Sequence, residues 1–207
     1  DVLSAAKNGR VAWFKNNGSQ SFTENGIDYL ADIRSVSSVD LDSDGDLDVI
    51  AAAYGVSALY WFVNDGSENF DPTVIATGLV NLSDVISVDM DRDGDMDIVI
   101  ASSADDKVHW YENNGFQNFD AHSITTGWAD GPRSVYAVDV DGDGDIDVLS
   151  ASEYDDKIAW YKNNGSQSFE GITITSNTDG AASVYAVDVD GDGDIDVLSA
   201  SESDDTI

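Results

Sequence analysis

The sequence predicts an all-β protein, a β-propeller whose blades are four-stranded antiparallel sheets with an acidic loop between the first two strands. One observation is the pattern D-x-D-x-D-G-D-x-D, which occurs four times, beginning at Asp40, Asp89, Asp139 and Asp188. Such regular self-similarity marks an array of repeated units. The second observation is that short β-branched runs bounded by turn residues fill each repeat, which has room for four strands. A solenoid of parallel strands is the alternative, but its repeats would be shorter.

Within a repeat we expect four strands separated by the acidic loop, a turn and a tight hairpin. The hairpin is predicted from Asn-Asn-Gly, because these residues tolerate positive φ. In the third repeat the elements are expected as follows: a first strand at 134–140, the loop at 139–147, a second strand at 147–152, a turn at 153–156, a third strand at 157–161, the hairpin at 163–165 and the start of a fourth strand at 167–169.

One repeat domain is expected over residues 1–207. Its predicted subdivisions are a partial blade at 1–33, repeats at 34–82, 83–132 and 133–181, and a second partial blade at 182–207. The sequence begins and ends within a repeat, since residues 1–5 match 147–151. Unpaired sheet edges promote association. We therefore expect either continuation into further repeats or self-association.

The acidic loops have the composition of a cation site. Five carboxylates within nine residues repel one another unless a cation neutralises them, and Ca²⁺ takes six to eight oxygen ligands at flexible geometry. We expect positions one, three, five and nine to offer carboxylates, position six to be a glycine at a sharp turn, and position seven to offer its carbonyl. About four Ca²⁺ ions are expected, held by these residues: Asp40, Asp42, Asp44, Asp46, Asp48, Asp89, Asp91, Asp93, Asp95, Asp97, Asp139, Asp141, Asp143, Asp145, Asp147, Asp188, Asp190, Asp192, Asp194 and Asp196.

These loops begin like EF-hand loops but do not continue like them. Position twelve of an EF-hand is a bidentate Glu on an exiting helix, whereas here it is Ala51, Ile100, Ser150 or Ser199. The residues after each loop are short β-branched runs. The loop is therefore expected to join two strands.

The overall charge limits the partners. The chain has 41 acidic and 9 basic residues, a formal net charge of −32. Nucleic acid is excluded as a partner because it requires clustered Lys and Arg, and anionic membranes are disfavoured for the same reason. The sequence has no cysteine and no apolar run long enough to insert in a membrane. Metal ions and packing must therefore brace the fold.

The aromatic residues repeat in register with the loops. Trp13, Trp61, Trp110 and Trp160 recur, and so do Phe22, Phe70, Phe119 and Phe169. We interpret both sets as blade-to-blade packing, with a sugar-stacking ladder as the alternative. Trp128 has no counterpart in the other repeats and is the candidate for contact with a partner, with filling of a hydrophobic gap as the alternative.

Catalytic chemistry is not predicted. His109 and His122 are the only histidines, and neither belongs to a repeated constellation. The Asp-Asp pairs at 105–106, 155–156 and 204–205 could suggest acid–base chemistry. Because they recur at one turn of the repeat, blade geometry is the preferred interpretation.

The strand, D-x-D-x-D-G-D-x-D loop and strand unit at 40–48, 89–97, 139–147 and 188–196 resembles the FG-GAP and VCBS repeats of integrin α-subunit heads and secreted bacterial proteins. The resemblance implies a Ca²⁺-bound β-propeller, commonly of seven blades, that is extracellular or at the cell surface. It implies a non-enzymatic role in adhesion, surface structure or recognition of a glycan or protein. The alternative is an accessory domain of a secreted polysaccharide-degrading enzyme.

Two segments are identical over twenty residues, 134–153 and 183–202. Repeats so alike present the same edges to their neighbours, which favours quasi-symmetric packing.

Overall fold

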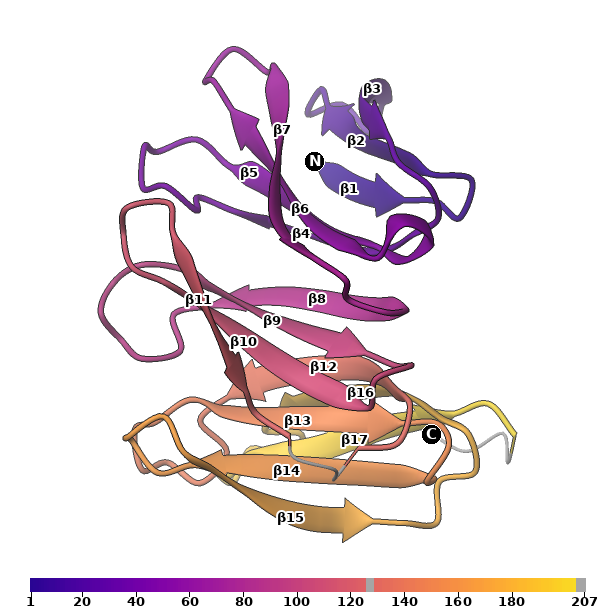
Figure 1. Ribbon diagram of the computed structural model, residues 1–207, viewed down its shortest axis with the longest axis vertical. Coiled ribbons are helices and arrows are strands. Elements are labelled where there is room, and N and C mark those ends of the chain that lie inside the picture. The colour runs from indigo at the N-terminus through magenta and orange to yellow at the C-terminus, as the bar shows by residue number, and fades with distance from the viewer. Residues whose placement is uncertain (126–128, 204–207) are drawn as a thin grey trace.

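The computed structural model, which describes residues 1–125 and 129–203, is a stack of antiparallel β-sheets (Figure 1). Three of the sheets have four strands, in the order of the chain. They consist of β4 (Ile33–Val39), β5 (Asp48–Ala53), β6 (Ala58–Asn64) and β7 (Phe70–Thr77); β8 (Leu82–Val88), β9 (Asp97–Ser102), β10 (Lys107–Asn113) and β11 (Phe119–Ser123); and β12 (Pro132–Val138), β13 (Asp147–Ser152), β14 (Lys157–Asn163) and β15 (Phe169–Thr175). The predicted four-stranded antiparallel unit is thus confirmed.

A smaller sheet lies at each end of this stack. The first has three strands, β1 (Val2–Ala5), β2 (Arg10–Asn16) and β3 (Phe22–Tyr29), and the last has two, β16 (Ala181–Val187) and β17 (Asp196–Ser201). A short 3-10 turn, Tyr54–Val56, follows β5. In Figure 1 the two small sheets lie toward opposite ends of the long axis, so the described residues form an open stack and not a closed ring.

Sheets pack through their first strands, with β4 beside β8, β8 beside β12, and β12 beside β16. The second strands β5, β9 and β13 are buried along their whole length. A strand covered on both faces needs no polar alternation, which explains why these strands are continuous runs of apolar and small residues. The hydrophobic core therefore consists of layers between successive sheets.

The layers contain most of the repeated aromatic residues, but Phe22 of the first sheet is 50% exposed, so the packing interpretation is wrong for it. Trp61 and Trp110 are fully buried, and the Trp61 ring meets Phe119 of the next sheet edge-on, with centroids 6.3 Å apart. Phe169 packs against the layer that contains Trp110. For these residues the packing interpretation is confirmed, because the two tryptophan rings are buried and the half-buried Phe119 and Phe169 pack against the layers that contain them.

The strands β4, β8, β12 and β16, which we call the inner strands, each begin with a β-bulge. Pairing between the first and second strands shifts by one residue between Ile33 and Ser35, and at the equivalent places in the other sheets, between Leu82/Asp84, Pro132/Ser134 and Ala181/Ser183. The extra residue is Arg34, Ser83, Arg133 or Ala182. A bulge redirects a side chain away from the regular alternation of the strand, so these four positions face a direction that the period-two pattern does not predict.

Antiparallel order places the loops of the repeat on two opposite edges. The acidic loops and the hairpins between third and fourth strands share one edge, at the left in Figure 1, whereas the turns between second and third strands lie on the other. Among the described residues, no helix is long and apolar enough to cross a membrane.

Candidate metal centre

The four acidic loops join the first and second strands and have the same backbone conformation. The glycine at position six has a φ between +97° and +100° in every copy, at Gly45, Gly94, Gly144 and Gly193. Position four is also left-handed, with φ of +60° at Ser43 and +64° at Arg92. The other two copies have glycine there, which adopts this conformation without strain. The acidic pattern alone does not single out position four, because its residue type varies between the copies.

A fixed set of hydrogen bonds shapes each loop. The position-one carboxylate accepts a bond from the N–H of the position-six glycine, at 2.9 to 3.2 Å in the four copies. The position-five carboxylate accepts one from the N–H of position seven, at 2.9 Å in each. These bonds turn the acidic side chains inward and concentrate negative charge at one point.

The position-nine aspartate fastens the loop to the sheet. One oxygen of Asp97 accepts a hydrogen bond from Met90 N, at 3.0 Å, and the other accepts one from Asn113 N, at 2.7 Å. Asp48 and Asp147 make the same pair of bonds. All three carboxylates are fully buried. The loop is therefore fixed at both its second residue and the end of the third strand.

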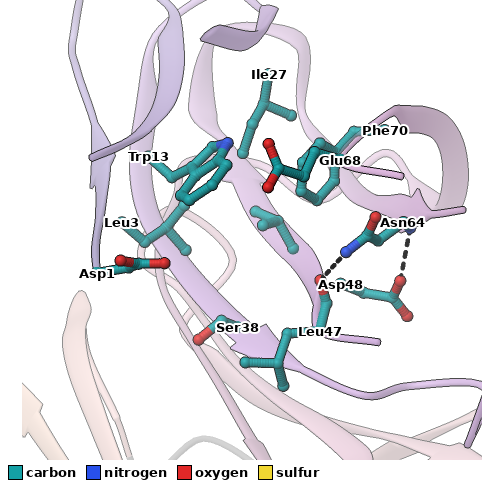
Figure 2. Close-up of a pocket in the computed structure, with 11 residues that line it drawn as sticks. Asp1, Leu3, Trp13, Ile27, Ser38, Leu47, Asp48, Asn64, Glu68 and Phe70 are labelled. Carbon is teal, nitrogen blue, oxygen red and sulfur yellow. Dashed lines mark hydrogen bonds between the residues drawn. The ribbon is translucent and has the colours of Figure 1, made fainter. Parts of the chain in front are cut away.

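An asparagine at the end of the third strand completes this fastening. Figure 2 shows Asn64, whose N–H donates to Asp48 and whose side-chain amide donates to the carbonyl of Leu47. Asn113 and Asn163 repeat the arrangement, and Asn113 also donates to Leu41 O in the preceding loop. The sequence interpretation missed these residues. The signal was the repeated spacing Trp-x-x-Asn, present in all four repeats.

Each loop brings three carboxylates together. Positions one, three and nine converge in three copies, whereas the first copy assembles positions one, three and five. In every group the ligand atoms lie within 4.8 Å of one another. The groups are Asp40, Asp42 and Asp44; Asp89, Asp91 and Asp97; Asp139, Asp141 and Asp147; and Asp188, Asp190 and Asp196.

The position-seven aspartates point elsewhere. A Cβ built on Gly66 would fall 2.5 Å from Asp46 Oδ2, so the Asp46 side chain lies against the neighbouring hairpin. Asp95 and Asp145 lie in the same way against Gly115 and Gly165. The hairpin glycines, which have φ between +71° and +74°, therefore make room for an acidic side chain as well as turning the chain.

The carboxyl groups are under electrostatic strain. Burial, opposed by the bonds from Asn113 and Met90, raises the pKa of Asp97 to about 6, and burial likewise raises the pKa values of Asp48 and Asp147. Burial and the charge of the neighbouring aspartates raise the pKa values of Asp42 and Asp91. A positive ion at this point would relieve both effects.

Two buried oxygen atoms fit a missing ligand. Asp42 Oδ1 and Asp89 Oδ1 are inaccessible to solvent and have no hydrogen-bond partner. A buried carboxylate oxygen without a partner is costly. Since the donors are all hard oxygens, the residues suit a hard cation better than a soft transition metal.

The neighbours of the loops differ between repeats. At the third loop, Lys162 forms ion pairs with Asp141 and Asp143, the second at 3.2 Å. The equivalent residue beside the second loop is Glu112, whose charge helps to raise the pKa of Asp91. Glu112 also forms a pair with His122 at 2.6 Å. The second loop thus has a more negative surrounding than the third.

The histidines and the described Asp-Asp pairs, the remaining candidates for catalysis, make contacts that support the fold. His122 stacks on Trp110, with centroids 4.7 Å apart, and burial lowers the pKa of His109. Asp106 and Asp156 adopt positive φ and accept hydrogen bonds from Gly131 N and Gly180 N, so they brace the connection to the next sheet. Trp128 and the pair at 204–205 lie outside the described residues.

Several solved structures resemble this fold. A lectin from Agrocybe aegerita, described as specifically recognising non-reducing terminal N-acetylglucosamine, aligns with a TM-score of 0.58 and 18% identity over 93% of this chain and 55% of its own. An auxiliary nutrient binding protein from Bacteroides ovatus aligns with a TM-score of 0.58 and 9% identity over 88% and 53% of the two chains. The V. cholerae biofilm matrix protein Bap1 aligns with a TM-score of 0.57 and 17% identity over 98% of this chain and 34% of its own.

The chain therefore spans about half, or less, of the length of these neighbours. At these identities the likeness concerns the fold alone. No curated protein sequence matches the chain. The model of the FG-GAP-like repeat, in contrast, matches four overlapping segments, residues 1–51, 40–100, 89–150 and 139–199. The last three segments each run from one acidic loop to the strand after the next loop, and the four together cover nearly all of the sequence. The chain belongs to the FG-GAP-like repeat family.

Proposed function

We propose that this chain is part of a calcium-stabilised, extracellular β-propeller that serves adhesion or recognition of a glycan or protein and has no catalytic activity of its own. The observation that supports it best is the fourfold recurrence of one loop geometry, with converging carboxylates in each copy. Repetition in all four loops suits a bracing ion, because each sheet needs the same support, whereas a catalytic metal is needed at one place only.

Calcium is the proposed ion for three reasons. Each loop supplies only oxygen donors, which suit hard cations in general and disfavour soft ones. The loop is exposed at positions four and five in every copy, so water can fill the remaining coordination positions. The first loop brings together a different set of positions from the other three, and Ca²⁺ tolerates such variation in ligand geometry, whereas Mg²⁺ requires a near-ideal octahedron.

The proposed ligands in each loop are the carboxylates of positions one, three, five and nine and the carbonyl of position seven. Positions one and nine already accept backbone hydrogen bonds, but a carboxylate oxygen has two lone pairs, so a bond to an N–H leaves one for a metal. An extracellular location follows from this proposal, since weak oxygen sites are filled where Ca²⁺ is abundant.

The test is a calcium titration of the purified chain with unfolding as the readout. Isothermal titration should give about four Ca²⁺ per chain, and excess EDTA should lower the melting temperature by more than about 10 °C, because binding to the folded state alone stabilises it. Magnesium at the same concentration serves as the control ion. A melting curve that EDTA leaves unchanged at neutral pH contradicts the proposal.

Recognition is tested separately from metal binding. The calcium-loaded chain is applied to immobilised glycans and proteins, and the same preparation is incubated with soluble polysaccharides to detect release of reducing ends. Retention without cleavage supports a recognition domain. Cleavage by the isolated chain would overturn the non-enzymatic part of the proposal.

A further inference from the structure

A polar cavity of about 370 Å³ lies on the edge of the stack opposite the metal loops. Its size falls within the range of roughly 300–1,000 Å³ that is typical of small-ligand sites. The cavity is lined by residues of the inner strands, Arg34, Ser83 and Arg133, and by residues of the turns after the second strands, Tyr54, Glu153 and Tyr154. Ala182 of the last sheet and Glu202, which follows the last strand of that sheet, also line it, so the cavity spans four successive sheets.

The β-bulges create this cavity. Arg34, Ser83 and Arg133 are the extra residues of the bulges that open β4, β8 and β12. In a regular strand the side chains of neighbours alternate between faces, and the bulge releases one residue from this constraint. Ala182, the extra residue of the bulge in β16, also lines the cavity, so four equivalent positions on four sheets converge on one place.

The guanidinium groups are held in fixed positions. Arg133 pairs with Glu202 at 2.8 Å and with Glu153 at 3.3 Å. Arg34 lies over the ring of Tyr54, 4.4 Å from its centroid, and pairs with Asp32 at 3.0 Å. Two Arg and two Glu line the cavity. Its local charge is balanced, in a chain that is otherwise strongly acidic.

One aromatic face remains available. Tyr154 is 66% exposed, yet its position is fixed from behind, since a Cβ on Gly131 would come within 2.6 to 3.0 Å of three of its ring atoms. Gly131 has a φ of +65°, so its backbone conformation and its lack of a side chain both fit the ring. An exposed ring that rests on glycine is a rigid platform rather than a free surface side chain.

We propose that this cavity binds a neutral pyranose sugar, with Tyr154 stacking against the apolar face of the ring and the Arg133 and Glu153 pair bonding to adjacent hydroxyls. A hydroxyl both donates and accepts, so it matches a surface where guanidinium donors alternate with carboxylate acceptors. A sugar also presents an apolar C–H face, which suits an aromatic platform. An anionic ligand is disfavoured, because the carboxylates of Glu153 and Glu202 face the same space.

The proposal rests on the proposed recognition function and gives it a site. Saturation-transfer NMR on the calcium-loaded chain is run with glucose, galactose, mannose and N-acetylglucosamine, and with galacturonate and inorganic phosphate as anionic probes. At least one neutral sugar should show transfer at millimolar concentration. The substitution Tyr154→Ala should weaken its binding about tenfold, the loss expected when a stacking partner is removed.

The matched control is Tyr29→Ala, because Tyr29 is equally exposed, at 66%, and lies on the first sheet, away from the cavity. Glu153→Gln is the second test variant, since it keeps the side-chain shape and alters the acceptor. Loss of binding in Tyr154→Ala with retention in Tyr29→Ala supports the site. Absence of transfer from every neutral sugar, equal loss in both variants, or tighter binding of an anionic probe overturns it.

The outcomes also separate this proposal from the broader one. If Tyr154→Ala retains full binding to immobilised glycans, the recognition function stands and this cavity is excluded as its site. If EDTA leaves the melting curve unchanged while sugar binding responds to Tyr154→Ala, the calcium proposal fails and the cavity stands. Each result therefore identifies which statement is wrong.

Discussion

The third and fourth acidic loops lie in segments of identical sequence, 134–153 and 183–202, but in different surroundings. Their local geometry is nearly the same: the position-six glycines have φ of +100° and +98°, and the position-nine carboxylates accept bonds of 3.1 and 3.0 Å from position two. Their burial differs sharply. Leu149 is fully buried and Leu198 is 38% exposed.

The difference separates what the local sequence determines from what the neighbours determine. Loop shape follows from hydrogen bonds within nine residues, so it forms wherever the sequence occurs. Burial and the pKa of the position-nine carboxyl depend on the third strand and the adjoining sheets. Asp147 meets Asn163 N at 2.7 Å and has a raised pKa because it is buried, whereas Asp196 is exposed.

The largest effect is expected from removing the position-nine carboxylate. Asp147→Ala leaves the buried N–H of Asn163 and the part-buried N–H of Val140 without an acceptor, and we expect a loss of about 4 kcal/mol in unfolding free energy. Asp196→Ala should cost about 1 kcal/mol, because water can reach its partner. Urea unfolding, with and without Ca²⁺, measures both. Equal losses in the two variants would show that burial does not control the role of this residue.

The next largest loss of stability is expected from a substitution in the strand after the loop. Leu149→Ala opens a cavity between sheets and should cost about 3 kcal/mol, whereas Leu198→Ala should cost less than about 1 kcal/mol because its side chain is partly hydrated. Urea unfolding at saturating Ca²⁺ keeps the metal sites filled in both. A loss at Leu198 that matches the loss at Leu149 would mean that another surface covers β17 in solution.

These comparisons also show how far the sequence predicts the molecule. The order of strands and the glycine at position six follow from local rules, since β-branched runs, a registered acidic pattern and Asn-Gly turns each specify a short segment. The bulge that turns Arg133 into the cavity does not follow from local rules. It depends on how this strand pairs with Ala151 and Ser152 of the neighbouring strand. The role of Asn113 could not be predicted from local sequence either, because its hydrogen bond to Leu41 joins residues 72 positions apart.

A smaller effect is expected where a lysine adjoins a loop. Lys162 forms ion pairs with Asp141 and Asp143 and must yield them to a bound cation. Lys162→Met should therefore increase the Ca²⁺ affinity of the third loop about fivefold, the equivalent of a partly exposed ion pair of roughly 1 kcal/mol. The amide resonances of Gly144 and Gly193 report on the third and fourth loops separately.

The matched control for this substitution is Lys15→Met. Lys15 occupies the equivalent place on the first sheet but pairs with Glu68, outside any metal loop. Lys15→Met should leave the Ca²⁺ affinities of the four loops unchanged. An unchanged Gly144 titration in Lys162→Met would show that the lysine does not compete with the ion.

The smallest effect concerns two junctions between sheets. Asp84 accepts bonds from Ser35 Oγ at 2.7 Å and Val135 N at 3.0 Å, whereas Ser134 takes the corresponding bond from Val184 N at the next junction. Burial raises the pKa of Asp84. A carboxyl whose folded pKa exceeds its unfolded value holds an extra proton in the folded state, so its contribution to stability is largest below about pH 4 and declines as pH rises through the folded pKa.

Asp84→Ser converts the first junction into the form of the second and should remove this dependence. The difference in unfolding free energy between the original chain and the variant should then decrease from pH 4 to pH 7, by less than about 1 kcal/mol, since four hydrogen bonds to Asp84 offset part of the burial. Comparing the two proteins at each pH in saturating Ca²⁺ cancels the titration of the metal loops. Parallel curves would mean that Asp84 ionises in the folded chain as readily as in the unfolded one.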